Sequence, residues 1–485
     1  MLKQLAARKS VAAINREIEA GPKLNRVLNR QALTAVGLGS MIGSGIFVLT
    51  GTVAAQHTGP AVTLAFLVAA IGCGLAALCY AELASMIPVS GSAYSYTYAT
   101  LGEGIAWFVG WNLALEYVMS GAAVAVSWSG YVVNLLAEFG VQLPAAFTNA
   151  PLAKVDGTLH HLGPTGAIIN LPAVLIVAAL TYLCYVGVKQ STKANAVMVL
   201  VKIAIIIIFI VVGLQFVSTD LWDPYLPANT GKFGEFGLSG VLQGAAIIFF
   251  AYIGFDQAAT TAQEARDPQR DVPWGIIAAL LISTTLYITM AAVLTGMVPF
   301  DQLNVSAPVA VALDAHPELG WLALPVKLGI IVGLTSVILM SLLGQPRIFM
   351  AMSRDGLLPP SMQKVHPTHR TPHIATLVTG VVAAFFAGVF PLDVLGELIS
   401  IGILIAFSAV CAGVVVLRHT QPEMARPFRV PFAKFTGVAG VVVCFAMAYA
   451  LPPDTWIRLV IWTAIGFAVY FFYGYRHSKV REQQS

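Results

Sequence analysis

Two glycine-containing stretches have the composition to interrupt apolar helices and free main-chain groups for binding. One reads G-S-M-I-G-S-G-I-F over residues 39–47, and the other reads F-F-A-Y-I-G-F-D over residues 249–256. Glycine costs a helix about 1 kcal/mol relative to alanine. Amides freed at a new helix N-terminus suit a carboxylate, and unwound carbonyls suit an ammonium. Together the two stretches predict a site for a zwitterion, such as an α-amino acid.

The first stretch has two other interpretations. Gly39 and Gly43 form a G-x-x-x-G pattern, which in an isolated apolar helix more often marks a packing face. Gly37, Gly39 and Gly43 also mimic a dinucleotide loop, but no strand precedes them. The second interrupted stretch favours a binding site over packing alone.

Several ionisable residues lie within apolar surroundings. Lys202 begins a long aliphatic run, and a charged lysine at the bilayer centre costs at least about 2.5 kcal/mol, so a functional role is expected unless the side chain snorkels. Glu116 precedes an uncharged run and is predicted as a second proton site, with a cytosolic vestibule or a structural buried acid as alternatives. Asp256 is expected to cap the interrupted helix, and Lys327 and Glu397 have no assigned role.

The composition places the chain in a membrane. Of its 485 residues 58% are hydrophobic and only 10% are charged, where a soluble domain has about 25% charged residues. Apolar segments of about 20 residues, the length that spans a bilayer, recur twelve times. Their centres lie near residues 44, 74, 116, 177, 206, 249, 286, 334, 381, 407, 443 and 465. We therefore predict an all-α membrane protein with twelve transmembrane helices.

The positions of the basic residues predict the orientation. With both termini in the cytosol, 22 of the 27 Lys and Arg residues fall in cytosolic segments and three fall outside. The interrupted first and sixth helices then run in opposite directions, five helices apart, which is typical of an inverted repeat. The predicted segments are 1–30 (cytoplasmic), 31–217 (helices 1–5), 238–417 (helices 6–10), 433–475 (helices 11 and 12) and 476–485 (cytoplasmic tail).

Other classes of protein are disfavoured. The sequence contains neither H-E-x-x-H nor a P-loop, and its interrupted stretches are single rather than repeated as in a channel filter. His160 and His161 lack further ligands at metal-binding spacing. We therefore expect no enzyme, cofactor, metal or nucleic-acid partner. Tyr94, Tyr96 and Tyr98 are expected in an interfacial belt.

The chain resembles the amino acid, polyamine and organocation transporter (APC) superfamily, and within it a bacterial member of the cationic amino acid transporter family. The likeness runs from about Leu28 to Tyr475. The matching motifs are G-L-G-S-M-I-G-S-G-I-F-V-L-T-G (37–51), Y-A-E-L-A-S-M-I-P-V-S-G-S-A-Y-S-Y (80–96), G-W-N-L-A-L-E-Y (110–117), F-F-A-Y-I-G-F-D (249–256), E-A-R-D-P-Q-R-D-V-P (264–273) and P-R-I-F-M-A-M-S-R-D-G-L-L-P (346–359).

The resemblance implies a secondary transporter of the plasma membrane with the leucine-transporter-like fold of five plus five helices and two further C-terminal helices. Such transporters move amino acids by alternating access and commonly use protons. It implies that Lys202 replaces a sodium ion and bridges helix 1 to helix 8. It also implies three sets of binding residues: Ile42, Gly43, Ser44 and Gly45 for the carboxylate, Phe250, Ala251 and Ile253 for the amino group, and Met340 beside the substrate side chain.

The substrate side chain stays open. Ser44, Phe255 and Met340 are small or apolar, which favours a broad or neutral range such as alanine over arginine or lysine. Exchange of amino acids or polyamines is the alternative to symport. Whether a small membrane subunit accompanies the chain is also left open.

Replacing Lys202 by methionine removes the group expected to gain and lose the coupling proton. Lys202→Met is therefore expected to abolish proton-gradient-driven uptake into proteoliposomes. Uptake at the wild-type level would refute this role.

Overall fold

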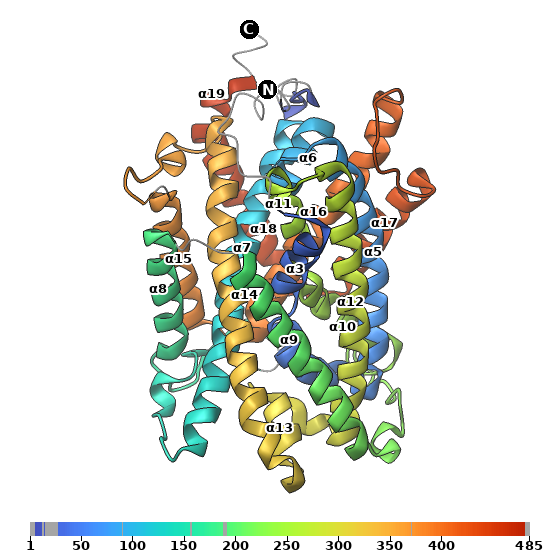
Figure 1. The fold of residues 1–485 in the computed structure, drawn as a ribbon, viewed down its shortest axis with the longest axis vertical. Coiled ribbons are helices and arrows are strands. Elements are labelled where there is room, and N and C mark those ends of the chain that lie inside the picture. Colours follow the sequence, from blue (N-terminus) through green and yellow to red (C-terminus); the bar gives the residue numbers. More distant parts are fainter. Residues whose placement is uncertain are drawn as a thin grey trace.

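The computed structural model describes residues 5–11, 14, 28–89, 91–155, 158–187, 192–369 and 371–480. Nine helices among these residues are long and apolar enough to cross a membrane. Two shorter apolar helices, α8 (Leu171–Val186) and α15 (His373–Val389), pack side by side at one edge of the bundle (Figure 1). The chain is thus a predominantly helical, multi-pass membrane protein, and the count of twelve spans stays a prediction.

The remaining α-helices range in length from three residues in α19 to 36 residues in α7. They are α3 (Arg30–Met41), α4 (Thr50–Val53), α5 (Val62–Met86), α6 (Ser92–Thr100), α7 (Glu103–Glu138), α9 (Thr192–Gly213), α10 (Gly237–Ile248), α11 (Asp256–Thr260), α12 (Pro268–Met297), α13 (Pro308–Asp314), α14 (Gly320–Arg354), α16 (Leu392–Thr420), α17 (Ala433–Ala450), α18 (Pro453–Val469) and α19 (Tyr475–His477). One antiparallel hairpin, β1 (Leu152–Val155) and β2 (Thr158–Pro164), pairs Leu152 with Pro164. The expectation of an all-α chain missed this hairpin.

The two ends of the bundle differ in the elements that close them. Figure 1 shows α6 and α19 at one end, here named the α6 end, and α13 at the opposite end, named the α13 end. The charge distribution of the sequence predicts that the α6 end faces the cytosol.

Two carboxylates at the α6 end bind described segments that lie near either end of the sequence. Asp355 accepts hydrogen bonds from Lys9 Nζ and from the Tyr94 hydroxyl, each at 2.7 Å. Glu103 accepts from the Tyr470 hydroxyl at 2.6 Å and from Ser478. Chain segments from before α3 and after α18 therefore meet on one surface.

The tyrosines predicted for an interfacial belt lie elsewhere. Tyr94 and Tyr96 are fully buried and Tyr98 is 1% exposed. The Tyr98 hydroxyl donates to Glu103 at 2.7 Å and the Tyr94 hydroxyl to Asp355, so these two rings serve the polar network of the α6 end. The belt prediction was wrong for all three, because α6 packs against α7 and α16.

The two charges without an assigned role are both neutralised near the α13 end. Lys327 on α14 is fully buried and pairs with Glu138 of α7 and with Asp314 of α13, whose Oδ1 lies 3.0 Å away. Glu397 on α16 forms an ion pair with Arg458 of α18 at 3.6 Å and accepts from the Thr455 hydroxyl at 3.2 Å. The lysine ties α13 to two long helices.

Lys327 is more deeply buried than its two carboxylate partners. This difference predicts which variants of the cluster are less stable. The lysine side chain is fully buried, but those of Glu138 and Asp314 are 37% and 49% exposed. Lys327→Met leaves carboxylates that water can solvate, whereas Glu138→Gln with Asp314→Asn leaves a buried cation without a counter-charge. The double variant is expected to melt several degrees below Lys327→Met in detergent, with Lys232→Met as the exposed control. The reverse order would contradict the buried-cation argument.

Candidate functional site

The first interrupted helix changes direction between α3 and the following π-helix, Gly45–Leu49. Ile42, directly after α3, is extended with ψ 97°. Helical hydrogen bonding resumes where the Phe47 amide donates to the Gly43 carbonyl at 3.2 Å. The amides of residues 44–46 precede that bond and stand at a helix N-terminus, where no intrahelical partner exists for them. They form a positive pole inside the protein.

The second interruption separates α10 from α11. A short 3-10 turn, Phe249–Tyr252, is followed by Ile253 in an extended conformation and by Gly254 at φ 122°. This φ lies in a region that residues with a Cβ rarely adopt, so Gly254 permits the turn.

The two interruptions pack directly on each other. A Cβ on Gly45 would lie 2.4 Å from Ala251 Cβ and 2.5 Å from Ala251 Cα. A Cβ on Gly254 would lie 2.6 Å from Ser40 Cβ and 2.9 Å from the Met41 nitrogen. Each glycine therefore lets the backbone of one interrupted helix approach the other.

Lys202 pairs with main-chain carbonyls of the first interruption. Its fully buried ammonium donates to the Gly39 carbonyl at 2.7 Å and to the Ile42 carbonyl at 3.1 Å. The stem of Lys202 runs past Gly333 of α14, where an added Cβ would lie 3.2 Å from Lys202 Cγ. The ammonium thus contacts the first interrupted helix, predicted helix 1. The contact with α14, which corresponds to predicted helix 8, is made by the aliphatic stem.

The carbonyls expected to bind an ammonium are partly engaged. The Phe250 carbonyl accepts from the Ile253 amide at 3.1 Å, and the Ala251 carbonyl accepts from the Tyr287 hydroxyl at 3.1 Å. Each carbonyl oxygen has a second lone pair that a ligand could use. Tyr287 was not foreseen from the sequence, because it lies on α12, far along the chain.

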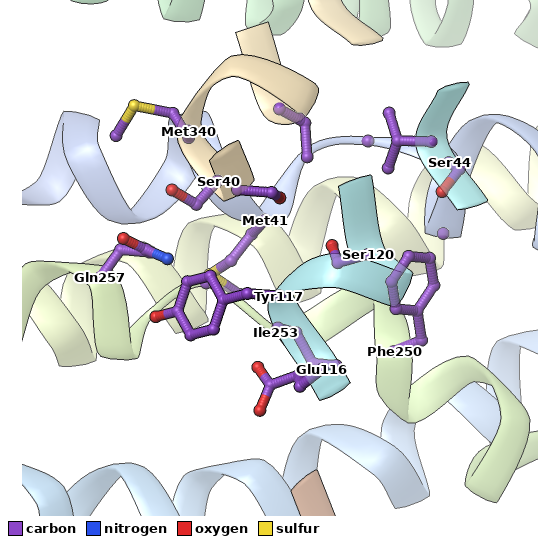
Figure 2. Close-up of a pocket in the computed structure, with 16 residues that line it drawn as sticks. Ser40, Met41, Ser44, Glu116, Tyr117, Ser120, Phe250, Ile253, Gln257 and Met340 are labelled. Atoms are coloured by element: carbon purple, nitrogen blue, oxygen red, sulfur yellow. The ribbon is translucent and has the colours of Figure 1, made fainter. Parts of the chain in front are cut away.

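A small pocket lies beside both interruptions (Figure 2). Six of the eight sequence-predicted substrate residues line it; Ile42 and Ala251 do not. The lining consists of Ser40, Met41, Gly43, Ser44, Gly45, Glu116, Tyr117, Ser120, Val124, Phe250, Ile253, Gly254, Gln257, Val337, Met340 and Ser341. None of these residues is basic.

Phe255 and Glu116 differ from what the sequence predicted about the pocket wall. Phe255 is fully buried against Tyr80 and Phe407 and does not line the pocket. Glu116 does line it, so the premise that the wall near the site holds only small or apolar side chains was wrong. A sequence signal existed, since Glu116 and Ser120 share one helical face at a four-residue spacing.

Comparison with known proteins agrees with this architecture. A family model described as "Amino acid permease" matches residues 28–471. The chain belongs to the amino acid permease family. This permease is 46% identical to the methylthioribose transporter of Bacillus subtilis (strain 168), over 94% of this chain and 95% of that relative.

Two further relatives are named for different substrates. This permease is 42% identical to the branched-chain amino acid permease BcaP of Bacillus subtilis (strain 168), over 98% of each chain. It is 40% identical to the vacuolar cationic amino acid transporter 4 of Arabidopsis thaliana, over 87% of this chain and 68% of that one. The permease is therefore an APC-superfamily transporter similar to the cationic amino acid transporters, and not an enzyme.

The close approach at Gly45 predicts the consequence of a single methyl group in this permease. Gly45→Ala places its Cβ against the Ala251 backbone, which has no room to move, and is expected to lower both melting temperature and ligand affinity, the latter at least about tenfold. Gly43→Ala is the matched control, because its Cβ meets only the Val337 side chain, at 3.2 Å. Equal thermal-shift results for both variants would contradict the interlocked backbone.

Proposed function

We propose that this chain is a secondary transporter that carries zwitterionic amino acids across the plasma membrane by alternating access and proton symport. Twelve spans with both termini in the cytosol complete the proposal. Its main support is the pairing of two oppositely polarised main-chain interruptions beside one pocket.

The carboxylate pole comprises the amides that follow Gly43, together with the Ser44 hydroxyl. Ser44 Oγ is fully buried and has no hydrogen-bond partner among the described residues, which supports a role in ligand binding. The ammonium pole comprises the carbonyls of Phe250 and Ile253, with Ala251 behind them. Ile42 serves this site indirectly, through its bond to Lys202.

Proton coupling is proposed at Lys202 and Glu116. The two hydrogen bonds from the Lys202 ammonium link α9 to the first interruption. Loss of the proton would weaken both bonds and free this part of helix 1 to move. Glu116 lies close enough to the binding pole to respond to an occupied pocket.

Neutral amino acids of modest size are the proposed main substrates, because Val337 and Met340 narrow the pocket. Exchange is the alternative mechanism. Methylthioribose is a second candidate substrate: the relative that shares 46% identity carries that name, and the pocket wall contains several hydroxyl groups.

Uptake and counterflow in proteoliposomes test this proposal. Labelled alanine is expected to accumulate when the external side is acidic, and preloaded unlabelled alanine is expected to accelerate its entry. The twenty amino acids and methylthioribose serve as competitors. Accumulation of methylthioribose without alanine transport would replace the amino acid proposal, and counterflow without any response to the proton gradient would favour exchange.

A further inference from the structure

Glu116 is a buried carboxyl group for which the chain supplies no partner. It is 1% exposed, and neither of its oxygens hydrogen-bonds to any residue in the described part of the chain. It lies in the wall of the central pocket (Figure 2). An unpaired buried charge is costly, so an ionised Glu116 requires a positive partner that enters the pocket.

The groups around Glu116 provide no positive charge. No basic residue lines the pocket, and Lys202 donates to carbonyls of helix 1. Asp256 on α11 interacts electrostatically with Glu116, with the same sign of charge. The other titratable groups around Glu116 are phenols: Tyr117, next to it on α7, Tyr80 of α5 and, beyond Asp256, Tyr96 of α6. The part of α14 that lines the pocket has no titratable side chain.

Two ligands satisfy such a carboxylate: a proton, or the cationic group of a substrate side chain. We infer that they alternate at Glu116, so that a neutral amino acid enters with a proton on Glu116 and a cationic amino acid enters in place of that proton. This inference rests on the proposed transport function and specifies the substrates and the proton stoichiometry of the same site.

The pocket geometry places a substrate side chain near Glu116. The carboxylate pole at Gly43–Gly45 and the Glu116 carboxyl line one continuous pocket. Glu116 lies one helical turn, about 6 Å along α7, from Ser120. Figure 2 shows Glu116 and Ser120 on successive turns, with Phe250 beside them. The inference places the substrate side chain along α7, so that its end meets this carboxyl group.

The charge balance of the two loaded states is the same. With a neutral substrate, the Glu116 carboxylate takes one proton from the external solution and later releases it to the cytosol. With a cationic substrate, the ammonium or guanidinium group pairs with the carboxylate and no proton is bound. At Glu116 each cycle moves one positive charge, and the neutral substrate brings one proton more than the cationic substrate, in addition to any proton that Lys202 exchanges with either.

The two substrate classes should respond to external pH in opposite directions. Lowering the pH protonates Glu116, which supports a neutral amino acid and removes the partner of a cationic one. Alanine uptake is therefore expected to rise, and inhibition by cationic amino acids to weaken, as the external solution becomes more acidic.

Proteoliposomes with a luminal pH dye test these expectations. Labelled alanine uptake is measured at acidic and neutral external pH against 2,4-diaminobutyrate, ornithine and lysine, which are cationic side chains of increasing length. At least one of them is expected to inhibit more strongly at neutral pH. Its own labelled uptake is expected to follow the membrane potential and to acidify the lumen less, per molecule taken up, than alanine uptake does.

Variants at Glu116 separate this role from a structural one. Glu116→Gln is expected to weaken cationic inhibition at least roughly tenfold, and to leave alanine counterflow measurable but insensitive to pH. Glu116→Asp should retain part of the discrimination. Glu235→Gln makes the same chemical change in an exposed loop and should leave the discrimination intact. Thermal stabilisation of the detergent-solubilised protein by each cationic amino acid reports binding and folding without transport.

The outcomes distinguish the inference from the proposed function. Failure of wild-type alanine counterflow refutes the proposed function, and the thermal-shift series still decides whether cations bind at Glu116. Alanine transport with no cationic inhibitor, equal luminal acidification by both substrate classes, or unchanged cationic inhibition in Glu116→Gln each overturns the inference.

Discussion

The structure depends on pairing the main-chain groups that two interrupted helices release inside a membrane protein. An amide or carbonyl without a partner costs several kcal/mol in hydrocarbon, so the interruptions must lie against protein or a polar cavity. Gly45 and Gly254 allow the two segments to pack on each other, at Ala251 and Ser40 respectively. The positions of the main-chain amides and carbonyls beside the pocket follow from this contact.

Protein groups satisfy some of the freed carbonyls and leave others for a ligand. Lys202 pairs with two carbonyls of the first interruption, and the Tyr287 hydroxyl pairs with one of the second. The amides that follow Gly43 have no such partner within the helix that they begin. The site therefore has carbonyls that the protein already pairs and amides that remain available to a ligand.

Sequence reasoning located the interruptions because glycine next to polar residues is a local signal. It also selected Lys202, since a charge in an aliphatic run is conspicuous. It missed Tyr287 and the hairpin that begins at Leu152, and it misplaced Tyr94, because burial and pairing at those positions depend on helices distant in sequence. Glu116 was recognised as unusual, but its place in the pocket wall depends on α7 lining the same pocket as both interruptions.

Relatives named for branched-chain and for cationic amino acids align with most of the chain. The main-chain poles explain this range of named substrates, because every residue has a peptide group whatever its side chain. Changes at Met340 or Glu116 alter the wall that faces the substrate, whereas among the twenty residues only proline removes a main-chain N–H group. Laboratory evolution should consequently shift the preferred side chain of the cargo far more readily than its requirement for two opposite charges.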